Sequence, residues 1–170
     1  EPMTSQVTVL MAVYNGSRYI RTCIDSILAQ TYRDFRFLIV DDASTDDTIE
    51  IIRSYDDRRI DLVSLESNVG QTAALNIGLR HLSTPWIARM DADDYSAPSR
   101  LEEQMRALEE NPSIRCLGTH VWIFHDNPEV IDSVLETPER HADIKRGLLR
   151  GSSIVHGSIV VNRAAILDIG

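Results

Sequence analysis

Residues 7–16 read VTVLMAVYNG, an apolar run interrupted only by Thr8 and followed directly by turn-forming residues. Apolar runs of this length are typical of strands that are buried on both faces of a parallel sheet. A buried strand followed by a helix with one apolar face is the first unit of an α/β fold. The apolar residues that follow recur at helical spacing: Ile20, Cys23, Ile24, Ile27 and Leu28.

The same alternation of strand and helix continues to about residue 111. It argues for an α/β fold with a doubly wound, mostly parallel central sheet flanked by helices. Ser44 and Asp47 match the S-x-x-D pattern of a capping box at the start of the second helix. The predicted elements are strands over 35–40, 60–65 and 86–90 and helices over 44–53, 71–82 and from 98 onward.

The remaining residues are less regular and predict an α+β extension at the C-terminal end of the same domain. We therefore expect residues 1–170 to form a single domain in which residues 1–6 are flexible. The expected elements of the extension are a strand over 115–124, a loop over 125–138, a helix over 139–150, a strand over 158–161 and a short helix over 163–169.

Composition and charge exclude several classes of protein. A chain of 170 residues with 43% apolar and 25% charged residues is long enough for a buried core. These values exclude a disordered chain, a collagen-like chain and a membrane bundle. The net charge of −9 repels phosphate backbones, so no nucleic-acid partner is expected. An anionic small ligand would need a metal ion or local hydrogen-bond donors to bind this protein.

The two cysteines, Cys23 and Cys116, belong to no C-x-x-C or Cys/His pattern. Two reduced thiols in a cytoplasmic protein fit this usage best. No apolar run near the N-terminus is long enough to span a bilayer. The expected location is therefore the cytoplasm, and peripheral contact with the inner face of a membrane stays open.

Polar residues follow three of the predicted strands directly. The first strand leads into residues 14–16 (Tyr-Asn-Gly), the second into 41–42 (Asp-Asp) and the fourth into 91–94 (Asp-Ala-Asp-Asp). In an open parallel sheet these ends share one edge, which is where such sheets bind ligands. Asp and Asn also favour turns and helix caps for structural reasons, so one cluster alone is weak evidence. Five carboxylates at two of these strand ends, on the same edge as the Tyr-Asn-Gly turn of the first strand, favour a binding site.

Asp91 and Asp93 form a D-x-D pattern after a buried strand. Two neighbouring carboxylates repel one another unless a proton or a cation lies between them. Their hard oxygen atoms suit Mg²⁺ or Mn²⁺, which water and phosphate oxygens would complete. Such a metal would let an acidic cleft hold a diphosphate. The D-x-D pattern by itself arises by chance in many chains, and its place at a strand end is what gives it value.

Tyr14 and the pair Asp41 and Asp42 suit a nucleoside. An aromatic ring can flank a heterocyclic base, and a carboxylate can accept hydrogen bonds from a base N–H or from ribose hydroxyls. The structural alternative for Tyr14 is an aromatic residue half-buried in a turn.

Five motifs occur in an order that resembles the family-2 glycosyltransferases, which have the Rossmann-like GT-A fold. The resemblance is strong over residues 7 to about 111 and looser beyond. Each motif alone is unspecific, whereas the combination is highly specific. The motifs are Val9–Gly16, Leu28–Tyr32, Ile39–Asp46, Asn68–Gln71 with Asn76 and Gly78, and Ala88–Asp94.

The resemblance implies transfer of a sugar from a nucleotide-diphosphate-sugar to an acceptor hydroxyl, with inversion and with help from Mg²⁺ or Mn²⁺. Carried over by position, Tyr14 and Asp42 would contact the nucleobase. Asp91 would lie near the ribose or the metal, and Asp93 would be the main metal ligand. The acceptor would be a saccharide or a lipid-linked molecule, in the synthesis of a cell-surface polysaccharide or glycolipid.

Further residues are weaker candidates under the same resemblance. Asp41, Asn68, Asn76 and Ala92 would belong to the nucleotide site, and His156 would contact the donor phosphates or the acceptor. The structural alternative for His156 is a loop histidine bonded to the backbone. Strand alternation leaves open whether the neighbouring Arg89 points to the site.

The sequence departs from the family pattern at two backbone positions and in its last segment. Ala12 stands where many members have Pro, and Ala43 where many have Gly. Members usually supply the catalytic base from an acidic pair beyond a helix and a Gly-rich turn. Residues 163–170 resemble only the approach to that segment.

The catalytic base is therefore expected beyond Gly170, the last residue of the sequence. This expectation describes a truncated catalytic domain with its donor site present and its base absent. The spacing of Glu129, Asp132 and Glu136 does not recommend any of them as the catalytic base.

Three other functions compete with this interpretation. A binding module that holds a nucleotide-sugar without catalysis stays open, because no base was identified. An aspartyl phosphatase also uses a D-x-D motif, but there the motif ends the first strand. A dinucleotide dehydrogenase is disfavoured because the turn over residues 14–19 lacks G-x-G-x-x-G. The sequence does not distinguish UDP, dTDP and GDP.

Overall fold

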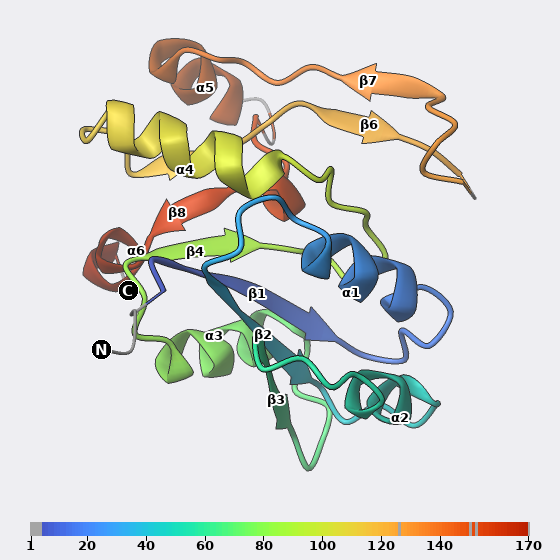
Figure 1. Ribbon diagram of the computed structural model, residues 1–170. Coiled ribbons are helices and arrows are strands. Elements are labelled where there is room, and N and C mark those ends of the chain that lie inside the picture. The colour runs from blue at the N-terminus through green and yellow to red at the C-terminus, as the bar shows by residue number, and fades with distance from the viewer. Residues whose placement is uncertain (1–4, 126, 150, 152, 170) are drawn as a thin grey trace.

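The computed structural model of the protein (Figure 1) describes residues 5–125, 127–149, 151 and 153–169. A short 3-10 helix covers His156–Ser158. The helices are α1 (Ile20–Leu28), α2 (Thr48–Arg53), α3 (Gln71–His81), α4 (Arg100–Glu110), α5 (His141–Leu148) and α6 (Arg163–Ile169). The strands are β1 (Val7–Val13), β2 (Phe35–Asp41), β3 (Ile60–Ser64), β4 (Trp86–Arg89), β5 (Cys116–Leu117), β6 (Val121–Ile123), β7 (Ser133–Leu135) and β8 (Val160–Asn162).

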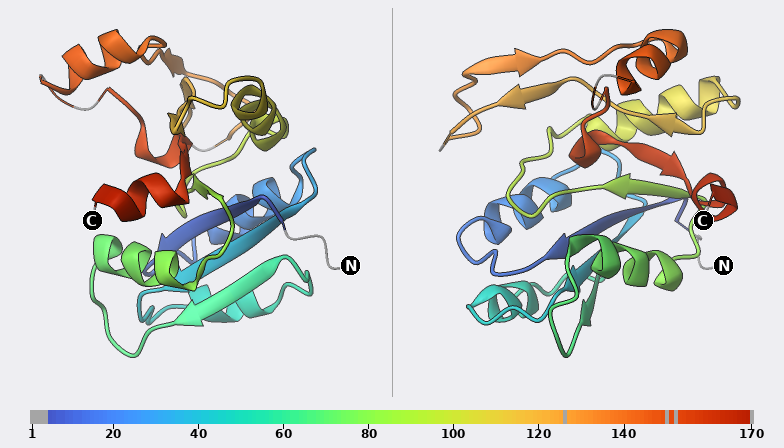
Figure 2. Two further views of the ribbon diagram at one scale, coloured as in Figure 1. Left: turned by 90° about the vertical axis from the view of Figure 1, so that its left-hand side faces the viewer. Right: turned by 180° about the vertical axis from the view of Figure 1, so that it is seen from behind.

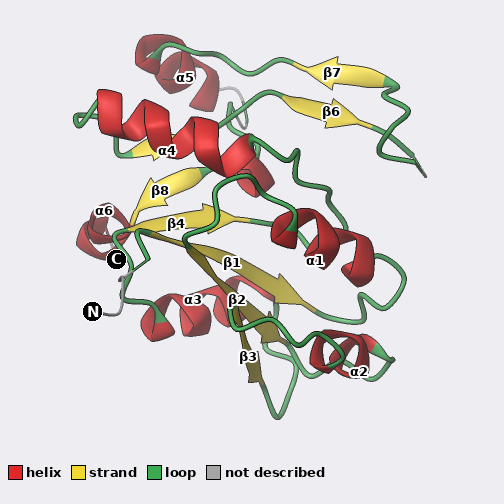
Figure 3. Cartoon of the chain, in the orientation of Figure 1, coloured by secondary structure: helices red, strands yellow, loops and turns green. Residues whose placement is uncertain are grey.

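The main sheet has six strands in the order β3-β2-β1-β4-β8-β5 (Figure 3). Strands β3, β2, β1 and β4 are parallel, while β8 runs antiparallel to both β4 and β5. This confirms the predicted α/β fold with a mostly parallel sheet between helices. The chain leaves β1 toward β2 and β3 on one side and later returns to place β4 on the other. The strand order therefore reverses between β1 and β4, which is where open sheets bind ligands.

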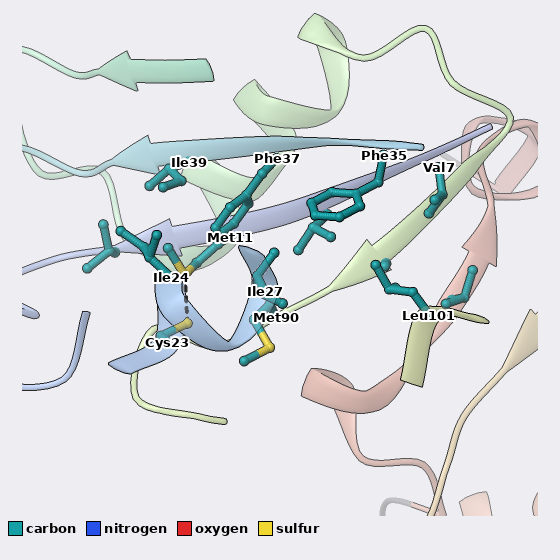
Figure 4. Close-up of a cluster of buried hydrophobic side chains, with 14 of the residues drawn as sticks. Val7, Met11, Cys23, Ile24, Ile27, Phe35, Phe37, Ile39, Met90 and Leu101 are labelled. Atoms are coloured by element: carbon teal, nitrogen blue, oxygen red, sulfur yellow. Dashed lines mark hydrogen bonds between the residues drawn. The ribbon is translucent and has the colours of Figure 1, made fainter. Parts of the chain in front are cut away.

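Side chains of β1 alternate between two apolar layers, one on each face of the sheet. Val7, Val9 and Met11 face the layer formed with α1 and α4 (Figure 4), which also holds Phe37 and Ile24. Leu10 and Ala12 face the layer formed with α3. Because both faces are covered, β1 must be apolar at nearly every position, as the run over 7–13 is. The only polar side chain of β1 is also buried: Thr8 shares a hydrogen bond of 2.8 Å with Thr84.

The N-terminal end of the chain is held against the sheet from Ser5 onward. The Ser5 hydroxyl donates to Asp34 Oδ1 at 2.9 Å, and the Trp86 amide donates to the Gln6 carbonyl at 3.1 Å. The flexibility predicted for residues 1–6 stays a prediction.

Both ends of the sequence carry predictions that fall on residues outside those described. Residues 1–4, for which flexibility was predicted, lie outside the described residues. Gly170, beyond which the catalytic base was expected, also lies outside them, and the described part of the chain reaches Ile169. The position of the base therefore stays a prediction.

The C-terminal extension differs from the prediction in its strands. The strand expected over 115–124 is divided: β5 joins the main sheet, whereas β6 pairs with β7 in a separate two-stranded sheet. The loop expected over 125–138 was wrong where it contains β7. The apolar signal of β7 is only a few residues long, and its pairing with β6 depends on a contact across a long connection. Figure 2 shows that β6, β7 and α5 form a layer of their own beyond α4.

Other predictions for the extension are confirmed with small shifts. Helices α5 and α6 lie within the predicted helical ranges, although Arg150, the last residue of the first range, is outside the described residues. The strand expected over 158–161 begins only at Val160, because the 3-10 helix occupies the preceding residues.

Both cysteines are free thiols, as predicted: Cys23 is buried and Cys116 is exposed. Within the part of the chain that the structure describes, no helix has both the length and the apolarity needed to cross a bilayer.

The turn after β2 contains a strained backbone position. Ala43 has a φ of 62°, in the left-handed region that glycine adopts readily and that other residues adopt at a cost. The departure from glycine at this position, noted in the sequence, therefore has a conformational cost in the fold.

We predict that Ala43→Gly stabilises the protein by about 0.5 to 1 kcal/mol, because relief of the left-handed strain exceeds the extra chain entropy of glycine. Ala107→Gly, inside α4, is the matched control and should destabilise by about 1 kcal/mol. Urea unfolding of both variants measures these changes. A loss of stability in Ala43→Gly as large as in the control would contradict the strain.

Candidate active site

A cleft of about 360 Å³ opens at the carboxyl ends of β1, β2 and β4. It lies at the reversal of strand order between β1 and β4, as expected for a ligand site in an open sheet. The residues that line it are Ala12, Val13, Tyr14, Asn15, Gly16, Tyr19, Asp42, Gln71, Asp91, Ala92 and Asp93.

The cleft brings together five of the residues singled out in the sequence. Tyr14, Asp42, Asp91, Ala92 and Asp93 all line it, and they come from the ends of three different strands. The sheet topology explains this, since parallel neighbours end at the same edge.

Four other candidates are not in the cleft wall. Asp41 is completely buried, whereas Asn68 and Asn76 are exposed outside it, and His156 lines a neighbouring pocket. Asp41 Oδ2 accepts a hydrogen bond from the Ser44 amide at 3.1 Å. The geometry therefore favours a structural role for Asp41 in the turn after β2.

Sequence reasoning missed Gln71 as a site residue. Gln71 is the first residue of α3, and its amide Nε2 donates to Asp91 Oδ1 at 3.1 Å. One feature of the sequence could have revealed Gln71 as a site residue. The helix that follows the third predicted strand begins at the carboxyl end of that strand, which is the same sheet edge as the acidic turns. Its first residue therefore faces the site.

Two exposed tyrosines, Tyr14 and Tyr19, lie in the cleft wall, with 50% and 43% of their surface accessible. Exposed aromatic rings on a cleft wall offer flat surfaces on which a heterocyclic base can stack. The Arg18 guanidinium lies 4.9 Å from the centre of the Tyr19 ring, so a cation also covers part of this wall.

Hydrogen bonds between two loops shape the end of the cleft near Tyr14. The Asn15 amide donates to Ser44 Oγ at 2.9 Å, and Asn15 Oδ1 accepts from the Thr45 amide at 2.8 Å. The capping box predicted from Ser44 and Asp47 was wrong. The Ser44 hydroxyl is engaged with Asn15, and α2 begins only at Thr48.

Asp46 takes the anchoring role in this pair of loops. Its carboxylate accepts hydrogen bonds from the Ser17 amide at 3.0 Å and from the Thr48 amide at 3.1 Å, and also from the Thr48 hydroxyl. Burial opposes ionisation, but the hydrogen bonds from Thr48 and Ser17 outweigh it and lower the pKa of Asp46 to about 2. The Thr48 hydroxyl in turn accepts from the Gly16 amide at 2.9 Å. One carboxylate thus joins the loops after β1 and β2.

Asp42 is only 2% exposed, although it lines the cleft. Its Oδ1 accepts from the Val69 amide at 2.8 Å and its Oδ2 from the Gly70 amide at 2.9 Å. The Asn68 side chain donates to the Asp42 carbonyl at 3.2 Å. Asp42 therefore fixes the loop that leads into α3. Each carboxylate oxygen has a second lone pair, so a ligand donor can still bind.

Asp91 is held from three sides. Its Oδ1 accepts from Arg89 Nη2 at 2.5 Å and from Gln71 Nε2 at 3.1 Å. Its backbone carbonyl accepts from the Cys23 thiol at 3.3 Å. The open question about Arg89 is thereby answered, because its guanidinium points to the acidic turn.

Negative charge accumulates in the turn after β4. Partial burial, and then the charges of Asp91 and Asp93, raise the pKa of Asp94 to about 6, although Arg100 and Arg89 oppose the rise. Burial and the same acidic turn also raise the pKa of the Cys23 thiol far above its usual range. Asp93 itself is exposed and accepts no hydrogen bond from any described residue. A cation at Asp93 would offset this accumulation.

The chemistry of the acidic turn fits a divalent cation that is shared with a ligand. Asp91 and Asp93 both face the cleft and offer carboxylate oxygens. No group of three or more His, Cys, Asp or Glu suited to a metal occurs among the described residues. Mg²⁺ commonly takes one or two protein carboxylates and completes its coordination with water and phosphate oxygens.

The segment around His156 packs against the acidic turn. A Cβ atom on Gly157 would lie 2.7 Å from Asp94 Oδ2 and 2.9 Å from Asp91 Oδ2, so only glycine fits this approach without a shift of the carboxylates. Partial burial and then the Arg89 charge lower the pKa of His156, against an opposing effect of Asp91. His156 lines a second pocket of about 310 Å³, together with Glu136.

Two solved structures share this fold. The Staphylococcus aureus TarS fragment 1–349 matches with a TM-score of 0.75 and 22% identity, over 96% of this chain and 49% of that fragment. The mannosyltransferase PcManGT of Pyrobaculum calidifontis, solved with GDP-Man and Mn²⁺, matches with a TM-score of 0.72 and 22% identity, over 99% of this chain and 48% of PcManGT. The architecture is therefore that of the GT-A glycosyltransferases.

The model of the family described as "Glycosyl transferase family 2" matches residues 8–169, so the chain belongs to that family. EpsE of Bacillus subtilis is 33% identical over 168 residues, which cover 94% of this chain and 57% of EpsE. WbnJ of Escherichia coli, an O-antigen biosynthesis glycosyltransferase, is 34% identical over 167 residues, covering 95% of this chain and 63% of WbnJ. The resemblance seen in the sequence is confirmed. The chain spans about half to two thirds of the length of these relatives.

We predict that Asp46→Asn lowers the free energy of unfolding at pH 7 by about 1 kcal/mol, the usual net value of a hydrogen bond. The native pKa lies below the ordinary carboxyl value, so the stabilisation is complete above about pH 4 and is lost as pH falls toward 2. Denaturant unfolding of both proteins between pH 7 and pH 2 measures this difference, which should narrow in that window. The exposed neighbour Asp47, changed to Asn, is the control. A difference that stays constant down to pH 2 would contradict the role of the ionised carboxylate.

Proposed function

We propose that this chain forms the donor-binding part of an enzyme that transfers a sugar from a nucleotide-diphosphate-sugar to an acceptor hydroxyl. One observation carries the proposal: a single cleft at the reversal of strand order holds exposed tyrosines on its wall together with the D-x-D turn. An aromatic surface suits the base, and an acidic turn that fits a cation suits the diphosphate.

The nucleoside would lie on the Tyr14 side of the cleft. The Tyr14 ring would pack against the base, and the Asp42 carboxylate, held by the amides of Val69 and Gly70, would accept from a base N–H. Because those two hydrogen bonds fix the carboxylate, it needs little reordering when a ligand binds. Ala92 would line the path between base and diphosphate.

Mg²⁺ or Mn²⁺ would be held by Asp93, whose carboxylate is free, with Asp91 as the second oxygen ligand. When bound, the cation would neutralise charge on the diphosphate as it leaves. The side chains of the chain itself orient these ligands: Arg89 and Gln71 fix Asp91, and Gly157 packs against its other oxygen.

The reaction would proceed by single displacement with inversion: the acceptor hydroxyl attacks the anomeric carbon as the nucleoside diphosphate departs. A carboxylate must take the hydroxyl proton. None of Glu129, Asp132 and Glu136 lines the cleft, so we assign no general base among them. We keep the proposal that an acidic residue beyond Gly170 serves as the base.

The relatives support the class of donor and of product. TarS has been solved with UDP-GlcNAc, and PcManGT with GDP-Man and Mn²⁺, so this fold holds nucleotide-sugars in other proteins. The relation to WbnJ favours a role in the synthesis of a cell-surface polysaccharide, with a saccharide or lipid-linked acceptor.

Isothermal titration calorimetry with UDP, GDP and dTDP, each with Mn²⁺ and with EDTA, tests the donor site. We expect one nucleotide to bind in a Mn²⁺-dependent manner. Asp93→Asn should weaken this binding by about 100-fold, equivalent to about 2.8 kcal/mol, with little change in melting temperature. Glu103→Gln, on the exposed face of α4, is the control and should bind as the unaltered protein does.

Two results would count against the proposal. If none of the three nucleotides binds in a Mn²⁺-dependent manner, the proposed donor site is contradicted. If Asp93→Asn binds with unchanged affinity, the role of Asp93 as a metal ligand is contradicted. Nucleotide binding without donor hydrolysis or transfer by the chain would favour a binding-only module.

A further inference from the structure

Arg89, at the end of β4, is a buried cation next to the acidic turn. Only 3% of the residue is exposed, and its Nη2 lies 2.5 Å from Asp91 Oδ1. Among the described residues, no acceptor meets its buried Nε and Nη1 atoms. A buried guanidinium depends strongly on its counter-ion, so the position of Arg89 and that of the Asp91 carboxylate are fixed together.

Two oxygen atoms of Asp91 are held by other parts of the protein. Arg89 and Gln71 share Oδ1, and the Cys23 thiol donates to the backbone carbonyl. No described residue donates a hydrogen bond to Oδ2, which lies on the side of Gly157. Asp91 can therefore offer one oxygen to a ligand, and the direction of that oxygen is set by the groups that hold the other.

The charges around the turn also favour a fixed position for the Asp91 carboxylate. Asp91, Asp93 and Asp94 carry three negative charges when ionised, and the guanidiniums of Arg89 and Arg100 oppose them from the protein side. The Arg100 Nη2 donates to the Arg89 carbonyl at 2.8 Å, so the two cations lie together on the protein side of the turn. These cations oppose the negative charge of the turn from the protein side.

From these contacts we infer that Arg89 is a positioning residue of the donor site: it orients Asp91, through Oδ1, so that Oδ2 is presented to the metal–diphosphate. This inference rests on the proposed function. It assigns Arg89 no contact with the donor, because its guanidinium is buried beneath the cleft.

An orienting role of Arg89 and a pure charge effect of Arg89 predict opposite changes in the effect of Mn²⁺ on nucleotide affinity. If Arg89 acted only through its charge, its removal would make the turn more acidic, and Mn²⁺ would increase the affinity for a nucleotide more than before. If Arg89 orients Asp91, its removal reduces this increase, because a metal ligand is no longer held in place. Loss of groups that orient metal ligands typically costs about 10- to 100-fold in metal affinity.

The test uses a ratio measured by calorimetry: the dissociation constant of UDP in EDTA divided by its dissociation constant in Mn²⁺. GDP or dTDP replaces UDP if the unaltered protein prefers it. Arg89→Met should lower this ratio at least about tenfold and leave UDP affinity in EDTA within about twofold. Arg89→Lys keeps the charge but not the planar guanidinium, and should also lower the ratio. Arg36→Met, which breaks an exposed ion pair with Asp61, is the control and should leave the ratio unchanged.

A double-variant cycle with Asp91→Asn separates orientation from general damage. In the Asp91→Asn background, Arg89→Met should cause no further fall in the ratio, because the group on which Arg89 acts is already altered. Gln71→Leu removes the second donor to Oδ1 at an exposed position and should show the same dependence on Asp91. This variant keeps the test available if Arg89→Met does not fold.

Three results would overturn the inference: a ratio that rises or stays constant in Arg89→Met, losses that add fully in the double variant, or equal weakening with and without Mn²⁺. A ratio of one in the unaltered protein would instead contradict the proposed function. In that case, the melting temperatures of the unaltered protein, the two single variants and the double variant, all without metal, still test the Arg89–Asp91 pair. The changes in melting temperature add if the two residues are independent and do not add if they are coupled.

Discussion

The repulsion among carboxylates at the end of β4 is the constraint on which the rest of the site depends. Asp91, Asp93 and Asp94 lie within four residues, and burial together with the charges of Asp91 and Asp93 raises the pKa of Asp94. Such a turn is stable only where cations or donors meet it from the protein side. Here β4 contributes Arg89 and α4 contributes Arg100, while Gln71 of α3 reaches Asp91 across the cleft. The helices around the sheet therefore serve the acidic turn as well as the apolar core.

The loop before α3 links the two halves of the cleft. Its amides at Val69 and Gly70 donate to Asp42, at the end of β2, and the next residue, Gln71, donates to Asp91, beyond β4. Strand β1 lies between β2 and β4 in the sheet. The loop thus spans the end of β1 and holds the nucleoside side and the metal side of the proposed donor site at a fixed separation.

The order of elements and the place of the site could be predicted from the sequence because they depend on local patterns. Apolar runs specified β1 and β2, and polar residues after three strands, acidic after two of them, marked the sheet edge. Side-chain partners could not be predicted in general, since Ser44 and Gln71 pair across loops that the fold alone brings together. Arg89 was also left open, because strand alternation did not decide where its side chain points, and its contact with Asp91 is seen only in the structure.

Strand β4 also bears on the order in which the site is built during synthesis. Its parallel neighbour β1 is made early, but its antiparallel neighbour β8 lies more than seventy residues later in the chain. The Arg89 amide donates to the carbonyl of Ile159, and Gly157 closes on the acidic turn from the same late segment. Contacts over such long sequence separations form slowly, because the loop must close first. During synthesis on the ribosome, the half of the sheet around β1 can therefore fold before the segment with Gly157 and β8 has emerged to pack against the acidic turn.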